Sequence, residues 1–460
     1  MEPLRIPHPT PEMAKTAAQG LIDEISVAFG SFPDERKPGN NRKYSMSDAA
    51  CSAFSVFFTQ SPSFLSFQRT LERSTGRSNV HSLFGIHHVP TDVQIRNILD
   101  PISPDHVAPL IARVGEVLWE QNCLSDYRVL NGTVLLALDG TDTFSSESGI
   151  HCPACHVTRH SDGRVQHRHI AVTPALVAPG ISRVIPLPPE FVVQSDGPGK
   201  QDCEIRAASR WIDRWGPRYA PRGVTLLGDD LYAHQPFCQK AVEAGFHFLF
   251  TCKLSSHPTL AEWVDDFAHT RTLGTFETVI ETSQGKGKGK RIPKVVRERW
   301  AFRFLETAPL RNTDDAMTVN WFELTVTNVE TGERLYHNSW ITNHPISPDS
   351  LVALALSGRA RWKIENENIQ TLKLGGYHLE HNFGHGTRHL SNLLASLNIL
   401  AFLLHTALEL LDARYRTLRF RYGSRVSFFQ ELTTLLNWFI FENWDHVIAV
   451  MFAKLRVDTS

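Results

Sequence analysis

Two apolar stretches that each end in an aspartate decide the fold: Thr133-Val-Leu-Leu-Ala-Leu-Asp139 and Val224-Thr-Leu-Leu-Gly-Asp229. Each is short, rich in branched side chains and bounded by Gly or Asp, which is typical of a buried strand. Helical patterns over 203–214 and 235–244 alternate with the later strand-like runs. The sequence therefore predicts an α/β core whose early strands are antiparallel and whose later strands are joined by helical crossovers.

Three carboxylates in this chain suit metal chemistry. Asp139 and Asp229 are expected at the carboxyl ends of their strands, where open sheets place their functional sites. A third, Glu365, lies on a predicted helix in the stretch Arg361-Trp-Lys-Ile-Glu365. Carboxylates from two strand ends and one helix can hold two Mg²⁺ or Mn²⁺ ions over a phosphodiester, where the ions stabilise the attacking and leaving oxygens. The pattern therefore predicts cleavage of nucleic-acid strands.

Two neighbouring acids compete for these roles. Asp230 follows Asp229 directly, and Glu367 lies two residues after Glu365. We favour Asp229 because it ends the strand and stands three residues before Tyr232. A purely structural origin is the alternative, since aspartates commonly begin turns and glutamates are common on helix surfaces.

Composition sets limits on the class of protein. The chain has 460 residues, of which 42% are hydrophobic and 21% charged, enough for about three domain-sized units. Its net charge of −1 does not mark it as a DNA-binding protein, so any DNA surface must come from local basic patches. Seven cysteines and the lack of a secretory pattern in residues 1–30 favour the reducing cytoplasm over a disulfide framework.

The longest apolar segment runs from Leu390 to Leu411. Polar residues such as Asn392, Asn398 and Glu409 interrupt it, and a lipid-exposed helix would tolerate them poorly. We therefore predict a buried helix in the protein core and no membrane partner.

The chain divides by pattern into five regions. Short helical segments over 47–60 and 64–73, followed by a polar break at 75–79, indicate a helical N-terminal region that could present one helix to DNA. A helical packing or dimerisation subdomain is the alternative there. The predicted regions are a helical DNA-binding region (1–125), the first part of the α/β core (126–255), a β-rich insertion (256–345), the core helix with Glu365 (346–390), and a helical C-terminal region suited to oligomerisation (391–460).

A cysteine- and histidine-rich hairpin is expected over 150–170. Asp162-Gly163 is a strong signal for a two-residue turn. With that turn, position 156 lies opposite 169 and position 158 opposite 167. The histidines that then share one face are His156, His160, His167 and His169.

The Cys-x-x-Cys pair before this hairpin suggests a metal ligand set. Cys152 and Cys155 with histidines across the turn could form a tetrahedral zinc site, and the predicted ligands are Cys152, Cys155, His160 and His169. Such a zinc ion would be structural and would staple the hairpin. Histidines that simply contact phosphates are the alternative.

Local basic segments could supply DNA affinity that the net charge lacks. Lys286, Lys288, Lys290 and Arg291 form a cationic, glycine-rich loop within the β-rich region. Such a loop is suited to phosphate contacts that do not depend on sequence. A solvated surface loop is the alternative explanation.

Three blocks of this chain resemble the catalytic blocks of bacterial insertion-sequence DDE transposases. The blocks are Asp139-Gly-Thr-Asp142, Gly228-Asp-Asp-Leu-Tyr232 and Arg361-Trp-Lys-Ile-Glu365. The similar group carries a Tyr-Arg-Glu-Lys signature and a β-strand insertion, and the similarity extends roughly over residues 45–410. It implies an RNase H-like catalytic core interrupted by the β-rich insertion, with helical N-terminal and C-terminal regions.

The resemblance also implies an activity and partners. Such an enzyme cuts double-stranded DNA at the terminal inverted repeats of its own element and joins the 3′ ends to target DNA. It acts as a homodimer or larger synaptic complex in the bacterial cytoplasm, at the nucleoid. Asp139, Asp229 and Glu365 would be its carboxylates, holding two Mg²⁺ or Mn²⁺ ions.

This chain departs from the Tyr-Arg-Glu-Lys signature at two positions. Arg361 matches its arginine, expected to grip a phosphate through the planar guanidinium fork. The tyrosine position is Gly358, so the role of that tyrosine is absent or supplied elsewhere. The lysine is Lys373, one residue later than in the pattern. Two other functions stay open: a domesticated descendant that binds DNA without cutting, and a zinc metalloenzyme centred on Cys152 and Cys155.

Overall fold

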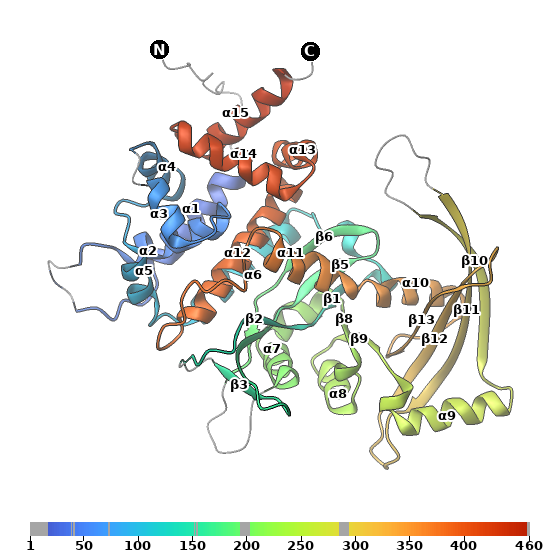
Figure 1. Cartoon of the computed structure of the whole chain (residues 1–460). Helices are drawn as coiled ribbons and strands as arrows, with labels where there is room; N and C mark the ends of the chain where they lie inside the picture. Colours follow the sequence, from blue (N-terminus) through green and yellow to red (C-terminus); the bar gives the residue numbers. More distant parts are fainter. Residues whose placement is uncertain are drawn as a thin grey trace.

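The computed structural model describes residues 17–37, 39, 42–71, 74–150, 152, 155–193, 203–284 and 294–457. It is a mixed α/β structure built on one nine-stranded sheet (Figure 1). In spatial order the strands are β10 (Gly274–Gln284), β11 (Lys294–Pro309), β12 (Thr318–Asn328), β13 (Arg334–Thr342), β9 (His247–Thr251), β8 (Val224–Gly228), β1 (Val134–Ala137), β5 (Ala175–Ala178) and β6 (Ile181–Pro186).

The centre of the sheet combines both strand directions. β1 pairs parallel with β8, and β8 pairs parallel with β9. The crossover segments contain α7 (Glu204–Tyr219) and α8 (Gln235–Glu243). On the other side of β1, the pairings to β5 and then β6 are antiparallel. Antiparallel early strands and helical crossovers between the later ones are thus both present, as predicted.

The central strands are apolar because both of their faces are covered. Every residue of β1 and β8 is buried. Figure 1 shows α7 and α8 on one side of these strands and α12 (Leu390–Leu411) on the other. A strand between two layers of helices reads as a continuous apolar run, which is the pattern of both stretches in the sequence.

The β-rich region predicted over 256–345 continues the central sheet. It begins with α9 (Pro258–His269), and β10 to β13 then form an antiparallel meander. β13 pairs antiparallel with β9, where Trp340 lies opposite Thr251. The meander therefore extends the sheet that carries the aspartates. Lys286, Lys288, Lys290 and Arg291 lie outside the described residues.

A second, smaller sheet follows Asp139. Its strands are β2 (Gly140–Ser146), β4 (Val165–Val172), β3 (His156–Arg159) and the short β7 (Glu190–Phe191), with β4 pairing to the other three. β3 and β4 form the predicted cysteine- and histidine-rich hairpin.

The turn of this hairpin is one residue longer than predicted. His160 N donates to Arg164 O at 2.9 Å, which leaves residues 161–163 as a three-residue loop. Gly163 closes the loop with a φ of +86°, a backbone conformation that favours glycine. The prediction of a two-residue turn was therefore wrong.

The longer loop shifts the strand register by one residue. His156 lies opposite Arg168 and Val157 opposite His167. Because side chains alternate between faces, a one-residue shift moves His156 and His160 to the face opposite His167 and His169. The prediction of four histidines on one face fails for this reason.

The N-terminal and C-terminal regions are helical and pack on each other. The N-terminal helices are α1 (Ala17–Gly30), α2 (Met46–Phe58), α3 (Phe64–Leu71), α4 (Ser74–Phe84), α5 (Asp92–Leu99) and α6 (Ala108–Glu120). The C-terminal half contains α10 (Pro348–Arg359), α11 (Gln370–Leu374), α12, α13 (Ala413–Tyr422), α14 (Arg425–Trp438) and α15 (Trp444–Val457). Helices from the two ends of the sequence lie side by side in Figure 1.

The polar break predicted at 75–79 is part of helix α4. The buried Asn79 side chain donates to the carbonyls of Leu436 and Phe439 and accepts from Phe441 N. These bonds to the C-terminal region satisfy a side chain that, in an isolated segment, would favour a turn. The prediction failed because the partners of Asn79 lie more than 350 residues away in sequence.

Helix α12 is the core helix of the molecule. Among the residues described here it is the single helix long and apolar enough to cross a membrane, yet 94% of its most apolar stretch is buried inside the protein. It packs against α2 and α6 on one side and against β6 of the sheet. The prediction of a buried helix is confirmed.

Candidate carboxylate site

The parallel register of β1 and β8 places two aspartates side by side. Ala137 lies opposite Leu227, and Leu138 N continues the ladder by donating to Leu227 O at 2.8 Å. Two residues beyond that pair, both strands have ended and the next side chains are Asp139 and Asp229. Both carboxylates therefore emerge at the carboxyl edge of the sheet, as the sequence pattern predicts.

Glu365 reaches the same edge from the segment after α10. It lies in the first turn of a π-helical segment, Ile364–Ile369, a rare conformation that is frequent at functional sites. Arg361 Nη2 donates to Glu365 Oε1 at 2.6 Å, and Arg361 Nη1 lies 3.8 Å from Asp139 Oδ2. The guanidinium thus bridges a strand carboxylate and the helical one.

The geometry separates Asp229 from its neighbour Asp230. Asp230 Oδ1 accepts from Lys253 N at 2.6 Å and lies 3.3 Å from His257 Nε2. Asp229 Oδ1 accepts from Leu231 N at 2.9 Å, and the charge of Asp229 contributes to the raised pKa of Asp139. Asp229 is therefore the better partner for Asp139.

A similar distinction holds for the two glutamates. Glu365 bonds to Arg361. Burial lowers the pKa of Lys363, and the charge of Glu367 offsets only part of that effect. The negative charge of Glu365 also contributes to the raised pKa of Asp139. Glu365 is thus the glutamate that belongs to the cluster.

Asp139 is the most perturbed carboxylate of this cluster. Burial is the main cause that raises its pKa from 3.8 to about 7, and the charges of Glu204, Glu365 and Asp229 raise it further against the lowering effect of Arg361. Crowded, partly buried carboxylates of this kind favour either a proton or a cation. Perturbed groups beside a cavity are a physical indication of a functional site.

A fourth carboxylate, Glu204, was missed by the sequence analysis. It lies in the first turn of α7 and accepts from Gly140 N at 3.1 Å and from the Tyr232 hydroxyl at 2.6 Å. Burial raises the pKa of Glu204. A side chain at position 140 would collide with this carboxylate, which explains the glycine after Asp139. In the sequence Glu204 looks like an ordinary helix-initiating acid.

A cavity of about 410 Å³ opens beside the cluster. Arg359 and Arg361 line it, and Trp362 beside them is 45% exposed. The complete lining comprises Asp229, Asp230, Thr251, Lys253, Tyr336, Asn338, Gly358, Arg359, Arg361 and Trp362. Its basic and aromatic groups next to carboxylates could accommodate a phosphate-bearing ligand.

Position 358 cannot hold the tyrosine of the signature. A Cβ there would lie 2.6 Å from Trp340 Nε1, so glycine lets α10 approach β13 closely. Tyr336 of β13 lines the cavity instead, with the Arg359 guanidinium 4.5 Å from its ring centroid. The cavity therefore contains a tyrosine that comes from a different element.

The other predicted phosphate contact lies in an ion pair. Lys373 Nζ is 2.7 Å from Glu380 Oε1, so the ammonium is directed at the loop after α11. Lys373 does not line the cavity, and the basic group in contact with the carboxylates is Arg361.

The predicted zinc ligands are brought together only in part. Cys152 Sγ lies 3.0 Å from His169 Nε2, and Cys155 Sγ lies 3.6 Å from His167 Nδ1. His160 is not in this group, because the shifted register directs it to the other face, where it hydrogen-bonds Gln166 at 3.3 Å.

Comparison with known proteins gives no assignment. No protein-family model matches this chain, and no curated protein matches it.

Proposed function

We propose that this chain is a DNA transposase that cuts at the terminal inverted repeats of its own insertion sequence and joins the 3′ ends to target DNA. The observation that carries the proposal is the meeting of Asp139, Asp229 and Glu365 at the carboxyl edge of two adjacent parallel strands. The catalytic core would be RNase H-like. Its antiparallel early strands, helical crossovers and carboxylates at strand ends support that fold.

The donor set suits Mg²⁺ or Mn²⁺. Both ions prefer carboxylate oxygens, and Asp139, Asp229 and Glu365 supply them with Glu204 close by. Two such ions, when bound, activate the attacking oxygen and stabilise the leaving one. The chain's carboxylates would hold the ions, and the excess negative charge that raises the pKa of Asp139 would be relieved by them.

Arg361 contacts two of the three carboxylates and lines the cavity. Among the described residues the three carboxylates do not form a compact three-ligand group, because the Arg361 guanidinium lies between Asp139 and Glu365. Metal binding would require Arg361 to release Glu365. The freed guanidinium then faces a cavity where its planar fork could bind a phosphate of the scissile strand.

The cavity supplies further contacts for DNA. Lys253 and Arg359 carry positive charge on its walls, and Trp362 presents an exposed aromatic face. Phosphate contacts of this kind position a duplex without reading its sequence. We assign recognition of the inverted repeats to the N-terminal helices. Assembly of two or more copies of the protein would bring both ends of the insertion sequence together.

A zinc metalloenzyme centred on Cys152 is the weaker candidate. Catalytic zinc needs an open coordination position that solvent or substrate can reach. His169 is fully buried and Cys155 is 2% exposed, while Cys152 is partly exposed, so most of that site is enclosed, as in a structural one.

Strand cleavage and end joining test the proposal. A DNA fragment carrying the gene's own flanks is incubated with Mg²⁺ or Mn²⁺ and either native protein or Asp139→Ala. We expect nicking at a flank boundary, lowered on the order of a thousandfold in the variant because one charge-stabilising group is lost. Asp142→Asn is the matched control, since Asp142 lies in the same block but pairs with Arg168.

The outcomes separate the alternatives. Specific binding to the flanks without cleavage by native protein would indicate a domesticated DNA-binding descendant. Cleavage that survives Asp139→Ala would show that the active site lies elsewhere. If Cys152→Ser alone abolished activity while retaining the fold, the zinc enzyme would replace the transposase.

A further inference from the structure

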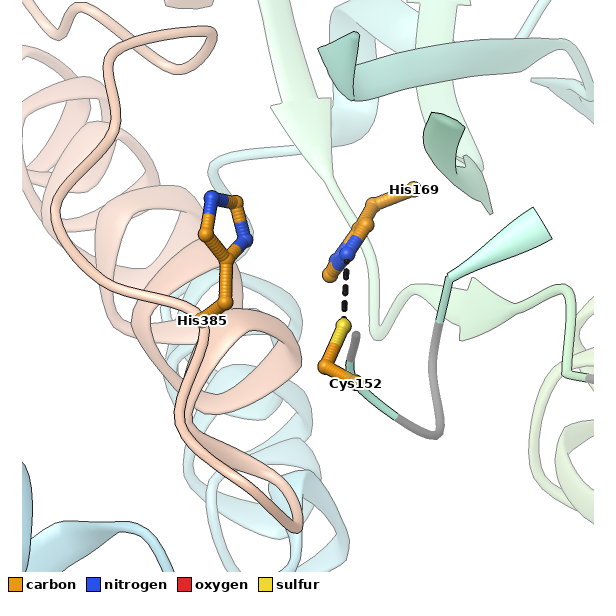
Figure 2. A group of neighbouring side chains, drawn as sticks. All are labelled: Cys152, His169 and His385. Carbon is orange, nitrogen blue, oxygen red and sulfur yellow. Dashed lines mark hydrogen bonds between the residues drawn. The ribbon is translucent and has the colours of Figure 1, made fainter. Parts of the chain in front are cut away.

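Three side chains from distant parts of the chain gather beside the hairpin. Cys152 precedes β3, His169 lies in β4, and His385 lies in the loop between α11 and α12. One ligand atom from each lies within 4.8 Å of the other two. Figure 2 shows the ring of His169 next to the Cys152 thiol and the ring of His385 beside them on a separate segment of the chain. The arrangement is independent of the carboxylate cluster.

A second sulfur lies next to the first. Cys155 N donates to Cys152 O at 3.1 Å, which holds the two cysteines close together. The two thiols also hydrogen-bond to each other. Two neighbouring cysteines and two histidines make up the donor set of a tetrahedral zinc site.

We propose that Cys152, Cys155, His169 and His385 bind a structural zinc ion. In a tetrahedral site, Zn–S bonds of about 2.3 Å and Zn–N bonds of about 2.0 Å place the sulfur and nitrogen ligands roughly 3.5 Å apart. Cys152 Sγ and His169 Nε2, at 3.0 Å, need only a small outward shift to reach that spacing. The site would join the hairpin after β1 to the loop before α12.

His169 is oriented as a metal ligand requires. Its Nδ1 lies 2.6 Å from the hydroxyl of Ser391, in the first turn of α12. A hydrogen bond from Nδ1–H to this hydroxyl leaves Nε2 without a proton and directed at Cys152. Histidine ligands usually have such an outer partner, which fixes both tautomer and ring orientation.

His385 is the ligand that only the tertiary structure reveals. Both of its ring nitrogens are buried, and neither has a hydrogen-bond partner among the described residues. Buried polar atoms without partners are rare because they forgo the hydrogen bonds that water would supply. The ring lies edge-on to Phe144 at 4.4 Å and 5.1 Å from the ring of His169. A bond to zinc would satisfy one of these nitrogens.

The loop that carries His385 is held firmly in place. Asp100 accepts hydrogen bonds from Thr387 N at 2.9 Å and from Arg388 N at 3.0 Å. Gly384 and Gly386, on either side of His385, have φ values of +133° and +63°. A side chain at position 386 would collide with the Asp100 carboxylate. The position of His385 is thus set by the loop itself.

Zinc content of the full chain tests this proposal. Tag-free protein is purified without chelator, dialysed against buffer containing trace Zn²⁺, and analysed by elemental emission. We expect about one zinc ion per chain, and loss of most of it in Cys152→Ser and in His385→Ala. His160→Ala is the matched control and should retain zinc, because His160 hydrogen-bonds Gln166 on the other face. No bound zinc in the native chain, or equal loss in His160→Ala, would overturn the site.

A cobalt experiment covers the case in which the variants do not fold. Native protein is stripped with a chelator and reconstituted with Co²⁺, whose absorption reports geometry and ligands. Tetrahedral d–d bands with a thiolate-to-cobalt charge-transfer band are expected, and His385→Cys should keep both with a stronger charge-transfer band. A spectrum of octahedral Co²⁺ without thiolate absorption would contradict the proposal. Neither result depends on DNA cleavage, so failure here leaves the proposed transposase function untouched.

Discussion

The carboxylate site and the cysteine–histidine site differ in their charge and in how far they are enclosed. Asp139, Asp229 and Glu365 bring like charges together beside an open cavity, and one arginine offsets them only in part. Around Cys152, neutral donors are enclosed by the hairpin and by the loop before α12. Crowded charge favours a ligand that arrives with positive charge, whereas a set of cysteines and histidines suits a structural zinc ion that binds as the thiols lose their protons. The carboxylate site is the one to which we assign the proposed function, and the cysteine–histidine site is the one to which we assign a structural role.

The two sites also differ in how they are positioned. Neighbouring backbone hydrogen bonds between β1 and β8 align Asp139 with Asp229. The other site depends on the hairpin register and on a loop more than 200 residues later in the chain. Three predictions test this contrast, and they are ordered by the size of the expected effect.

The largest effect is expected from replacing Glu365 with glutamine, and the same replacement at Glu367 is the comparison. Glu365→Gln should lower the rate of strand cleavage on the order of a thousandfold, because the site loses one of three charged metal ligands. Glu367→Gln should change the rate less than about tenfold, because Glu367 acts on Lys363 rather than on the cluster. Single-turnover cleavage assays at saturating Mg²⁺ measure both. The reverse ranking would move the catalytic glutamate to position 367.

A smaller effect is expected on stability. In the folded chain the pKa of Asp139 is about 7, above the unfolded value near 3.8, so the folded state holds the proton more tightly. Stability is therefore lost as pH rises from about 4 to about 7. The shift corresponds to at most about 4 kcal/mol, since each unit of pKa is worth about 1.4 kcal/mol.

Asp139→Asn removes this titration and should raise the thermal midpoint at pH 8 in Mg²⁺-free buffer. The gain over native protein should shrink as the pH falls towards 4. Calorimetry across this pH range measures it, with Asp142→Asn as the control carboxylate. A gain of equal size at pH 4 and pH 8 would show that burial of the Asp139 charge does not weaken the fold.

The smallest effect concerns the outer partner of His169. Ser391→Ala removes the hydroxyl that lies 2.6 Å from His169 Nδ1. If zinc is bound as proposed, its affinity should fall roughly tenfold to a hundredfold, measured by competition with a chromophoric chelator. Strand cleavage should stay within a few-fold of native. Unchanged affinity would mean that the hydroxyl does not orient the imidazole.

Hydrophobic patterns in the sequence predicted the elements whose structure depends mainly on residues close together in the chain. The two apolar stretches were recognisable as strands because every residue of β1 and β8 is buried. The polar interruptions of the segment from Leu390 to Leu411 indicated a core helix, and that helix is 94% buried over its most apolar stretch. Each of these inferences depends on hydrophobic pattern within a few turns or strand residues.

The predictions from sequence failed where a partner distant in sequence, or the length of a loop, determines the structure. A third loop residue, Ser161, shifted the hairpin register and removed His160 from the predicted ligands. Asn79 is helical because its amide bonds to residues near the C-terminus. Glu204 and His385 carry no local signal that distinguishes them from other acids and histidines.

By itself, the sequence determined an α/β core with aspartates at two strand ends, a glutamate one helical turn after an arginine, and a buried C-terminal helix. Only the tertiary structure decided that Arg361 bridges Asp139 and Glu365, that Glu204 joins them, and that His385 rather than His160 faces Cys152. The physical reason is the distance along the sequence that separates the residues which decide each feature. Hydrophobic periodicity and strand ends are encoded within a few residues, whereas side chains far apart in sequence meet only after register and packing are set.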